Sequence, residues 1–147
     1  MLDTYDRVVR VIKMAEVIHG RGYVYSIQYH IVWCVKYRRK ILYRDVVSSL
    51  RSILDKISQD NGFHINEFSA EPDHVHILLS CSPQHYIPDM IKALKGASGR
   101  LLMKEFGDEL RNKLWDGHVW NRSYFIATVN DNTEEQVRNY IHAQRER

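Results

Sequence analysis

The chain has 147 residues, enough for one compact domain with a hydrophobic core but too few for a second catalytic domain. Hydrophobic residues make up 44% and charged residues 27%, which excludes a disordered chain, a collagen and a coiled coil. The formal net charge of +3 permits an anionic partner without specifying one. Because no apolar run could span a membrane and no signal peptide is apparent at the N-terminus, we expect a cytoplasmic protein without a membrane partner.

The N-terminal part predicts an extension followed by a strand and a helix. Residues 1–22 are a charged, weakly helical lead that ends at two glycines, so we expect one domain over residues 23–147. From Tyr23 to Val35 every odd position is apolar or aromatic, and this period of two predicts a long strand. Apolar residues at helical spacing then predict a helix over residues 46–61 that ends at Gly62.

The middle of the sequence predicts a hairpin. Two short apolar segments, residues 63–70 and 74–81, are joined by Glu71-Pro72-Asp73. Proline fixes its own φ and disfavours helix at the residue before it, so this tripeptide is typical of a turn. Cys34 and Cys81 both lie in apolar strand-like segments, and we interpret them as small buried hydrophobic residues.

A second helix is predicted from Ile87 to about Phe106, where Gly107 offers a left-handed cap. Two further glycines, Gly96 and Gly99, lie inside it. Each costs a helix about 1 kcal/mol relative to alanine. They therefore indicate close packing or a ligand that needs access to the backbone.

The C-terminal part predicts a strand over residues 119–129 and a helix through Arg145, with cap residues from Asn130 to Thr133. The order of elements is then strand, helix, strand, strand, helix, strand, helix. This order fits an α+β fold, a ferredoxin-like (RRM-like) antiparallel sheet with packed helices. Many unrelated functions use that fold, so function must be argued from residues.

Two histidines in the second hairpin strand form a candidate metal site. His74 and His76 lie two residues apart, so both imidazoles point to one face of the strand while Val75 and Ile77 point to the other. Two neutral imidazoles side by side can chelate one cation. A pair of histidines on a solvated sheet face is the alternative.

Tyr140 and Gln144 form a second constellation in the last helix. Their spacing of four residues places the phenol and the amide on one face, one turn apart. The carbonyl oxygen of Gln144 could supply a third metal ligand. Alternatively, Tyr140 packs with Val137 and Ile141 in the buried stripe of the helix.

Basic residues with aromatic neighbours form a third feature. Cations bind phosphates and aromatic faces stack on bases, which is how single-stranded nucleic acid is bound. A solvated basic surface explains the same residues about as well. His30 lies on the opposite strand face from Tyr29 and Ile31, either close enough to a metal or phosphate to assist or simply buried and hydrogen-bonded. The candidate DNA-binding residues are Lys36, Arg38, Arg39, Lys95, Arg100 and Arg122.

Four segments together resemble a known family, the small single-tyrosine HUH transposases of the insertion sequence 200-like group, often called TnpA. The resemblance covers about residues 23–145 and is carried, in family order, by YHIVWCVKYRRK, EPDHVHILLS, WNRSYF and NYIHAQ. It implies the HUH endonuclease architecture, with a divalent metal, Mg²⁺ or Mn²⁺, held by His74, His76 and Gln144. It also implies Tyr140 as the nucleophile.

The resemblance implies a homodimer that cleaves and rejoins single-stranded DNA at the hairpin-bearing ends of an insertion sequence through a 5′-phosphotyrosine. Two other functions are considered. One is a domesticated repeat-associated tyrosine transposase with the same chemistry. The other is a non-enzymatic ferredoxin-like nucleic-acid-binding protein, which predicts an RNP-type aromatic motif that this sequence lacks.

Overall fold

The computed structural model describes residues 18–20, 23–114, 116–128 and 133–144. Its centre is a four-stranded antiparallel sheet in the order β4-β5-β3-β6. In chain order these are the second, third, first and fourth strands of the sheet, which is the ferredoxin-like order. The predicted α+β fold is therefore confirmed. The strands are β3 (Ile27–Cys34), β4 (His64–Glu71), β5 (His74–Cys81) and β6 (Phe125–Ala127).

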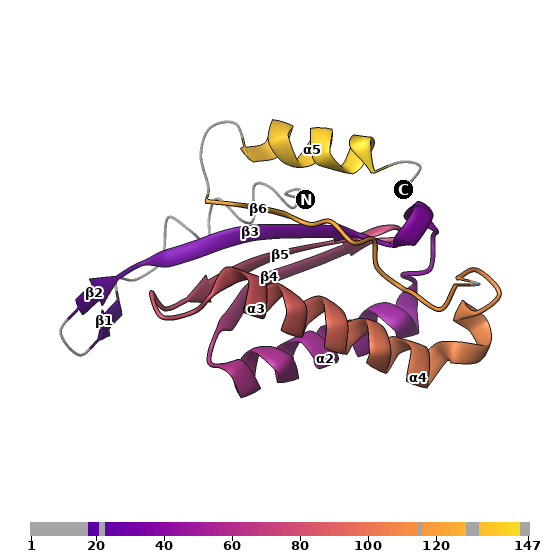
Figure 1. The fold of residues 1–147 in the computed structure, drawn as a ribbon, viewed down its shortest axis with the longest axis horizontal. Helices are drawn as coiled ribbons and strands as arrows, with labels where there is room; N and C mark the ends of the chain where they lie inside the picture. Colours follow the sequence, from indigo (N-terminus) through magenta and orange to yellow (C-terminus); the bar gives the residue numbers. More distant parts are fainter. Residues whose placement is uncertain (1–17, 21–22, 115, 129–132, 145–147) are drawn as a thin grey trace.

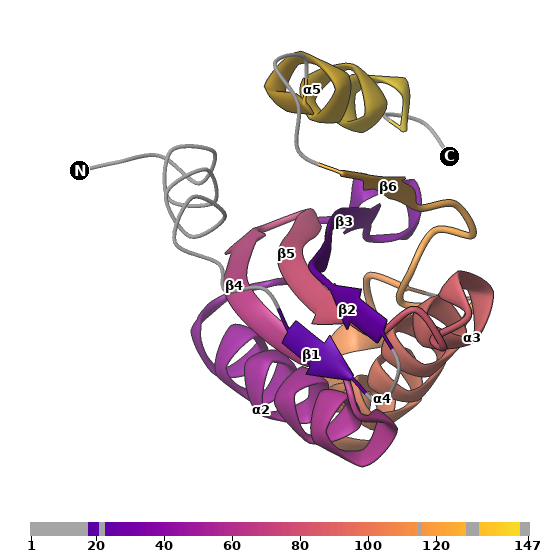
Figure 2. The ribbon, with the colours of Figure 1, turned by 90° about the vertical axis from the view of Figure 1, so that its left-hand side faces the viewer.

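Helices lie on both faces of this sheet, unequally. One face carries the long helices, and the other carries only α5 among the described helices (Figures 1 and 2). No described helix is long and apolar enough to cross a membrane. The first group is α2 (Arg44–Asn61), α3 (Ile87–Ile91), the π-helix η2 (Lys92–Ala97) and α4 (Ser98–Leu110), while α5 spans Thr133–Ala143.

The hydrophobic core lies between the sheet and the long helices. Alternation along β3 and β5 sends one set of side chains into this core, among them Trp33 and Ile77, and the other set to the α5 side. Both predicted buried cysteines, Cys34 and Cys81, are buried and form no disulfide. The sheet thus separates a closed apolar layer from a face that carries histidines.

The long first strand is interrupted at its beginning. Its predicted span divides into β2 (Tyr23–Tyr25) and β3, with a break at Ser26. β2 pairs with β1 (Ile18–Gly20) in a separate two-stranded sheet. The two strands pair across the glycine-containing break that the sequence shows, while the lead before Ile18 lies outside the described residues.

The predicted fourth strand over residues 119–129 is wrong in extent. Only Phe125–Ala127 join the sheet as β6, and Val35 and Trp120 form an isolated bridge. Between them, the carbonyl oxygens of Asn121 and Ser123 accept hydrogen bonds from the ammonium of Lys95. Residue 129 and the predicted cap residues 130–132 lie outside the described part of the chain.

The predicted end of the second helix is also wrong. The helix continues through η2 to Leu110, and Gly107 lies inside it without the positive φ of a left-handed cap. A kink at Phe106, with φ −117° and ψ 22°, is the only trace of an ending there. The guanidinium of Arg111 lies 3.1 Å from where a Cβ of Gly107 would be.

Gly62 and Gly96 provide a matched test of these backbone assignments. Gly62 ends α2 with φ +76°, so we expect Gly62→Ala to lower the free energy of unfolding by about 1 kcal/mol. A Cβ at Gly96 would meet no atom within 4 Å, so Gly96→Ala should raise that free energy by about 0.5–1 kcal/mol. Urea denaturation measures both. Equal effects of the two substitutions would contradict the assignments.

Candidate functional site

His74 begins β5 and is oriented by the residue before it. Its Nδ1 lies 2.8 Å from Oδ1 of Asp73, which leaves Nε2 free for a ligand. Arg38 donates from Nε and Nη2 to the other oxygen of Asp73, at 3.0 and 2.8 Å. Burial raises the pKa of Asp73, but the hydrogen bonds from His74 and Arg38 outweigh this and hold it below its usual value. The carboxylate is therefore ionised and fixes the imidazole.

The turn that carries Asp73 is tied to the chain following β3. Val35 donates its N–H to the carbonyl of Asp73 at 2.9 Å, and Ile41 and Leu42 both donate to Pro72 at 3.0 Å. Arg38 reaches Asp73 from a left-handed backbone, with φ 50°. That conformation costs a non-glycine residue about 1–2 kcal/mol, so the surrounding contacts must hold it in place.

His76 lies beside His74 on the same face of β5, as predicted. Nδ1 of His30 lies 2.6 Å from Nε2 of His76, and the two rings are 4.8 Å apart. Burial lowers the pKa of His30 to about 4 and that of His76 to about 3, so both are neutral at pH 7. His30 is completely buried, and its Nε2 has no partner. His30 is thus buried and hydrogen-bonded to a candidate ligand, while its assisting role stays a prediction.

Tyr140 and Gln144 share one face of the C-terminal helical segment, as their spacing predicts. Their common partner is Ser123, whose Oγ lies 2.7 Å from the phenol oxygen of Tyr140 and donates to Oε1 of Gln144 at 3.0 Å. Asn121 donates to the same Oε1 at 2.8 Å. Burial raises the pKa of Tyr140 although the Ser123 hydrogen bond lowers it, so the phenol is protonated at pH 7.

Lys95 holds the segment that carries these partners. Its ammonium donates to the carbonyl oxygens of Asn121 and Ser123 at 2.6 and 2.8 Å. Burial lowers the pKa of Lys95 to about 8. Because these two residues also contact Tyr140 and Gln144 through their side chains, Lys95 links η2 to the tyrosine helix.

Cys34 connects the histidines to the tyrosine. It pairs with His74 in the register of β3 and β5, and its carbonyl accepts the N–H of Asn121 at 2.9 Å. The side chain of Asn121 in turn donates to Gln144, one helical turn from Tyr140. The structure therefore brings the candidate ligands and the candidate nucleophile to the same end of the sheet.

The six candidate DNA-binding cations fall into two groups. Lys36 pairs with Asp116 at 3.1 Å, Arg38 pairs with Asp73, and Lys95 binds carbonyl oxygens. These three charges are engaged inside the protein. The other three are exposed and form no ion pair with a described residue; they are Arg39, Arg100 and Arg122.

The imidazoles of His74 and His76 each keep one ring nitrogen that is not bonded to Asp73 or His30, and such nitrogens suit a divalent cation. Both lone pairs of the Gln144 carbonyl oxygen are engaged by Asn121 and Ser123, so ligation by Gln144 requires one of these bonds to open. Among the described residues, no three His, Cys, Asp or Glu side chains form a metal-ligand group. The histidines fit a metal, and the remaining ligands must be amide, water or phosphate oxygens.

Sequence reasoning missed Asp73, Asn121 and Ser123. Asp73 directly precedes His74, and a carboxylate next to a candidate ligand is a signal that could have been used. Ser123 and Asn121 carry no such signal, because their contacts depend on how the segment before β6 crosses the sheet edge.

Comparison with known proteins identifies the class. Residues 23–144 match the family described as "Transposase IS200 like". The ISDra2 transposase TnpA of Deinococcus radiodurans is 47% identical over 137 residues, which covers 93% of this chain and 97% of that protein. The transposase for insertion sequence element IS200 of Salmonella typhimurium is 34% identical over 122 residues, which covers 83% of this chain and 79% of that one.

Solved structures agree with this assignment. A crystal structure of a proposed transposase from Deinococcus radiodurans R1 superposes with a TM-score of 0.83 at 42% identity, covering 88% of this chain and 99% of that one. A REP-associated tyrosine transposase bound to a REP hairpin shares the fold, with a TM-score of 0.53 at 14% identity over 86% of this chain and 76% of that one. The chain belongs to the IS200-like transposase family.

The buried histidine pair predicts a loss of stability in acid. The unfolded chain protonates these histidines below pH 6.5, but the folded chain does so only near pH 4 and 3. Stability should therefore fall as pH drops below 6.5, by up to about 1.4 kcal/mol per pH unit for each histidine. Urea denaturation in EDTA measures this slope. We expect His30→Gln to flatten it, with the exposed His64→Gln as control, and an unchanged slope in His30→Gln would contradict the assignment.

Proposed function

We propose that this transposase cleaves and rejoins single-stranded DNA at hairpin-bearing insertion-sequence ends through a 5′-phosphotyrosine on Tyr140. The observation that carries the proposal is the position of the phenol: it bonds to Ser123, and its helix is tied through Gln144 and Asn121 to Cys34, which pairs with His74. The proposed nucleophile and the imidazoles of His74 and His76 thus lie toward one end of the sheet. The family assignment supports DNA breakage and joining as the reaction.

In the proposed reaction the phenol oxygen of Tyr140 attacks the scissile phosphorus in line. The bond from phosphorus to the 3′-oxygen breaks, the phenol proton balances the new 3′-hydroxyl, and the 5′-phosphate stays on the tyrosine. Because the energy of the broken bond is kept in the phosphotyrosine, a later attack by a 3′-hydroxyl can reverse the reaction without ATP.

His74 and His76 are the proposed ligands of Mg²⁺ or Mn²⁺, with Gln144 as the proposed third. A bound divalent cation would neutralise charge on a non-bridging phosphate oxygen and orient the phosphate. Asp73 holds the tautomer of His74 that exposes Nε2, and Arg38 holds Asp73. His30 holds His76 in the same way from β3.

The proposed substrate contacts outside the reacting phosphate are made by the exposed cations Arg39, Arg100 and Arg122. Phosphate contacts of this kind would supply much of the affinity and little sequence information. The proposed working form is a homodimer, which light scattering would detect at twice the chain mass of 17.4 kDa.

Tyr140→Phe tests the nucleophile. The substitution removes one oxygen and keeps the ring, which packs 5.9 Å from that of Phe125. We expect no denaturation-resistant protein–DNA adduct when this variant is incubated with a hairpin-bearing single strand from the flanks of the gene and Mn²⁺. Tyr43→Phe, at an exposed tyrosine, is the control and should form the adduct. Adduct formation by Tyr140→Phe at the wild-type rate would assign the nucleophile to another tyrosine.

His74→Ala and Arg38→Gln test the metal site. We expect His74→Ala to abolish cleavage while hairpin binding stays nearly intact, because phosphate contacts supply most of the affinity.

Arg38→Gln removes the partner of Asp73, so Mn²⁺ affinity measured by calorimetry without DNA should fall by about 10-fold or more. Arg39→Gln, at the exposed neighbouring arginine, is the control. Full cleavage by His74→Ala would exclude this site.

A further inference from the structure

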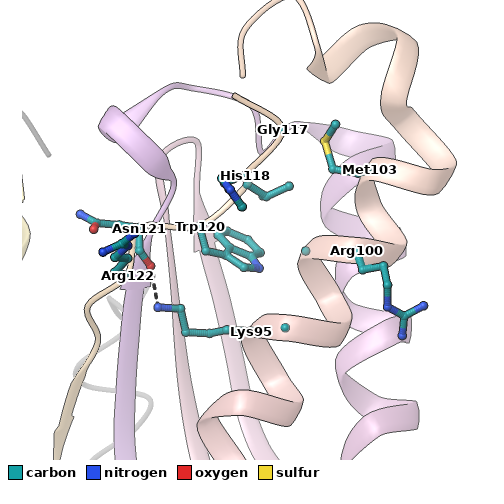
Figure 3. Close-up of a pocket in the computed structure, with 11 residues that line it drawn as sticks. Lys95, Arg100, Met103, Gly117, His118, Trp120, Asn121 and Arg122 are labelled. Atoms are coloured by element: carbon teal, nitrogen blue, oxygen red, sulfur yellow. Dashed lines mark hydrogen bonds between the residues drawn. The ribbon is translucent and has the colours of Figure 1, made fainter. Parts of the chain in front are cut away.

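A hollow opens between residues 117–122, which directly precede the Ser123 that bonds to Tyr140, and the helices η2 and α4 (Figure 3). Its volume is about 520 Å³, which is within the usual range for a small-molecule site. One wall is the backbone of η2 and α4 at Gly96 and Gly99, and the other is the chain from Gly117 to Arg122. This hollow shares Lys95 and Asn121 with the site described above, but neither the candidate ligands nor Tyr140 are among the described residues that line it.

The rim of the hollow is cationic. Arg100 extends from α4 on one side, and Arg122 lies on the other (Figure 3). Neither forms an ion pair with a described residue, and none of the residues known to line the hollow in the described part of the chain is a carboxylate. The carboxylate nearest along the chain, Asp116, is paired with Lys36. The rim therefore favours an anionic ligand.

The interior is apolar, and Trp120 forms its fixed part. The indole N–H donates to Ser98 at 2.9 Å, and the ring packs edge-on against Trp33. Gly99 permits this packing, since a Cβ there would lie 3.2 Å from the ring. Trp120 is therefore a rigid part of the wall.

Gly96 differs from Gly99 because nothing covers it. A Cβ at Gly96 would have no neighbour within 4 Å, so the helix backbone is open to the hollow. His118 also lines the hollow, and this exposed residue has a ring that can stack on a base. The π-helix at this position adds a second irregularity of a kind frequent at functional sites.

We propose that the hollow binds one unpaired nucleotide of the single-stranded DNA substrate. The base lies in the hollow, which Gly96 and His118 both line, and its flanking phosphates contact Arg100 and Arg122. This inference rests on the proposed function for the class of substrate. It adds a place where a base, and not only the phosphate chain, contacts the protein.

The location suits a nucleotide near the cleavage position. The chain from Val119 to Arg122 lines the hollow, while the side chain of Asn121 in the same segment bonds to Gln144. One short segment thus separates the proposed base site from the proposed nucleophile. Occupancy of the hollow would help select which phosphodiester is cut.

Gly96→Leu tests the proposal, because it fills the hollow at a position where the helix accepts a side chain. The probes are fluorescein-labelled strands of about 12 nucleotides, oligo-dT, oligo-dA and an abasic strand with the same phosphates. Fluorescence anisotropy gives the ratio of affinities for base-bearing and abasic strands. We expect this ratio to fall by about five-fold or more in Gly96→Leu, because a stacked base is lost. Gly96→Ala, which leaves most of the space, should keep the wild-type ratio.

An unchanged affinity ratio in Gly96→Leu would overturn the proposal. Equal losses of affinity for base-bearing and abasic strands would give that result and would indicate phosphate contacts alone. If circular dichroism shows that Gly96→Leu is unfolded, Met103→Trp fills the hollow from α4 and is held to the same result. Arg100→Gln and Arg122→Gln should weaken all three probes and lower the salt slope by about one each.

The wild-type protein separates this inference from the proposed function. If the wild-type protein forms the Tyr140 adduct and Gly96→Leu keeps the wild-type affinity ratio, the base site is excluded and the proposed reaction stands. If the wild-type protein forms no adduct but Gly96→Leu lowers the affinity ratio, the base site stands and the proposed reaction is excluded.

Discussion

The pairing of β3 with β5 fixes which face of the sheet carries chemistry. The register joins eight residue pairs, among them Cys34 with His74 and Val32 with His76. A slip of one residue would exchange the two faces of β5 and move both imidazoles into the apolar core. The fully buried residues of the opposite face, such as Trp33 and Ile77, oppose that slip. Burial on one side of the sheet therefore determines where the candidate ligands His74 and His76 lie on the other.

A second constraint joins the two layers at the sheet edge. Lys95 starts from the layer of long helices and ends on the carbonyl oxygens of Asn121 and Ser123, whose side chains hold the tyrosine helix. A buried ammonium requires such acceptors, because removing it from water without hydrogen bonds is costly. Because the carbonyl oxygens of Asn121 and Ser123 accept from this ammonium, they are not used in the hydrogen-bond ladder of the sheet. The shortness of β6 and the placement of Tyr140 thus have one cause.

Local patterns predicted the fold and part of the site. The alternation of β3 and β5, the Pro72 turn and the spacing of Tyr140 and Gln144 all depend on neighbours in sequence, and the structure agrees with each. Contacts between distant segments were not predictable. The Lys95 clamp and the ion pair of Arg38 with Asp73 both join residues more than 25 positions apart, and both change the role of a cation first assigned to DNA.

The turn between β4 and β5 differs from the usual loose tip of a hairpin. Pro72 and Asp73 accept three backbone N–H groups from the chain after β3, and Arg38 grips the Asp73 side chain. Hairpin tips are ordinarily among the first parts of a protein to open, because few bonds cross them. Here opening the tip requires breaking the connection to a fully buried strand. We therefore expect the backbone amides around His74 to exchange with solvent about as slowly as those of the buried strand β3.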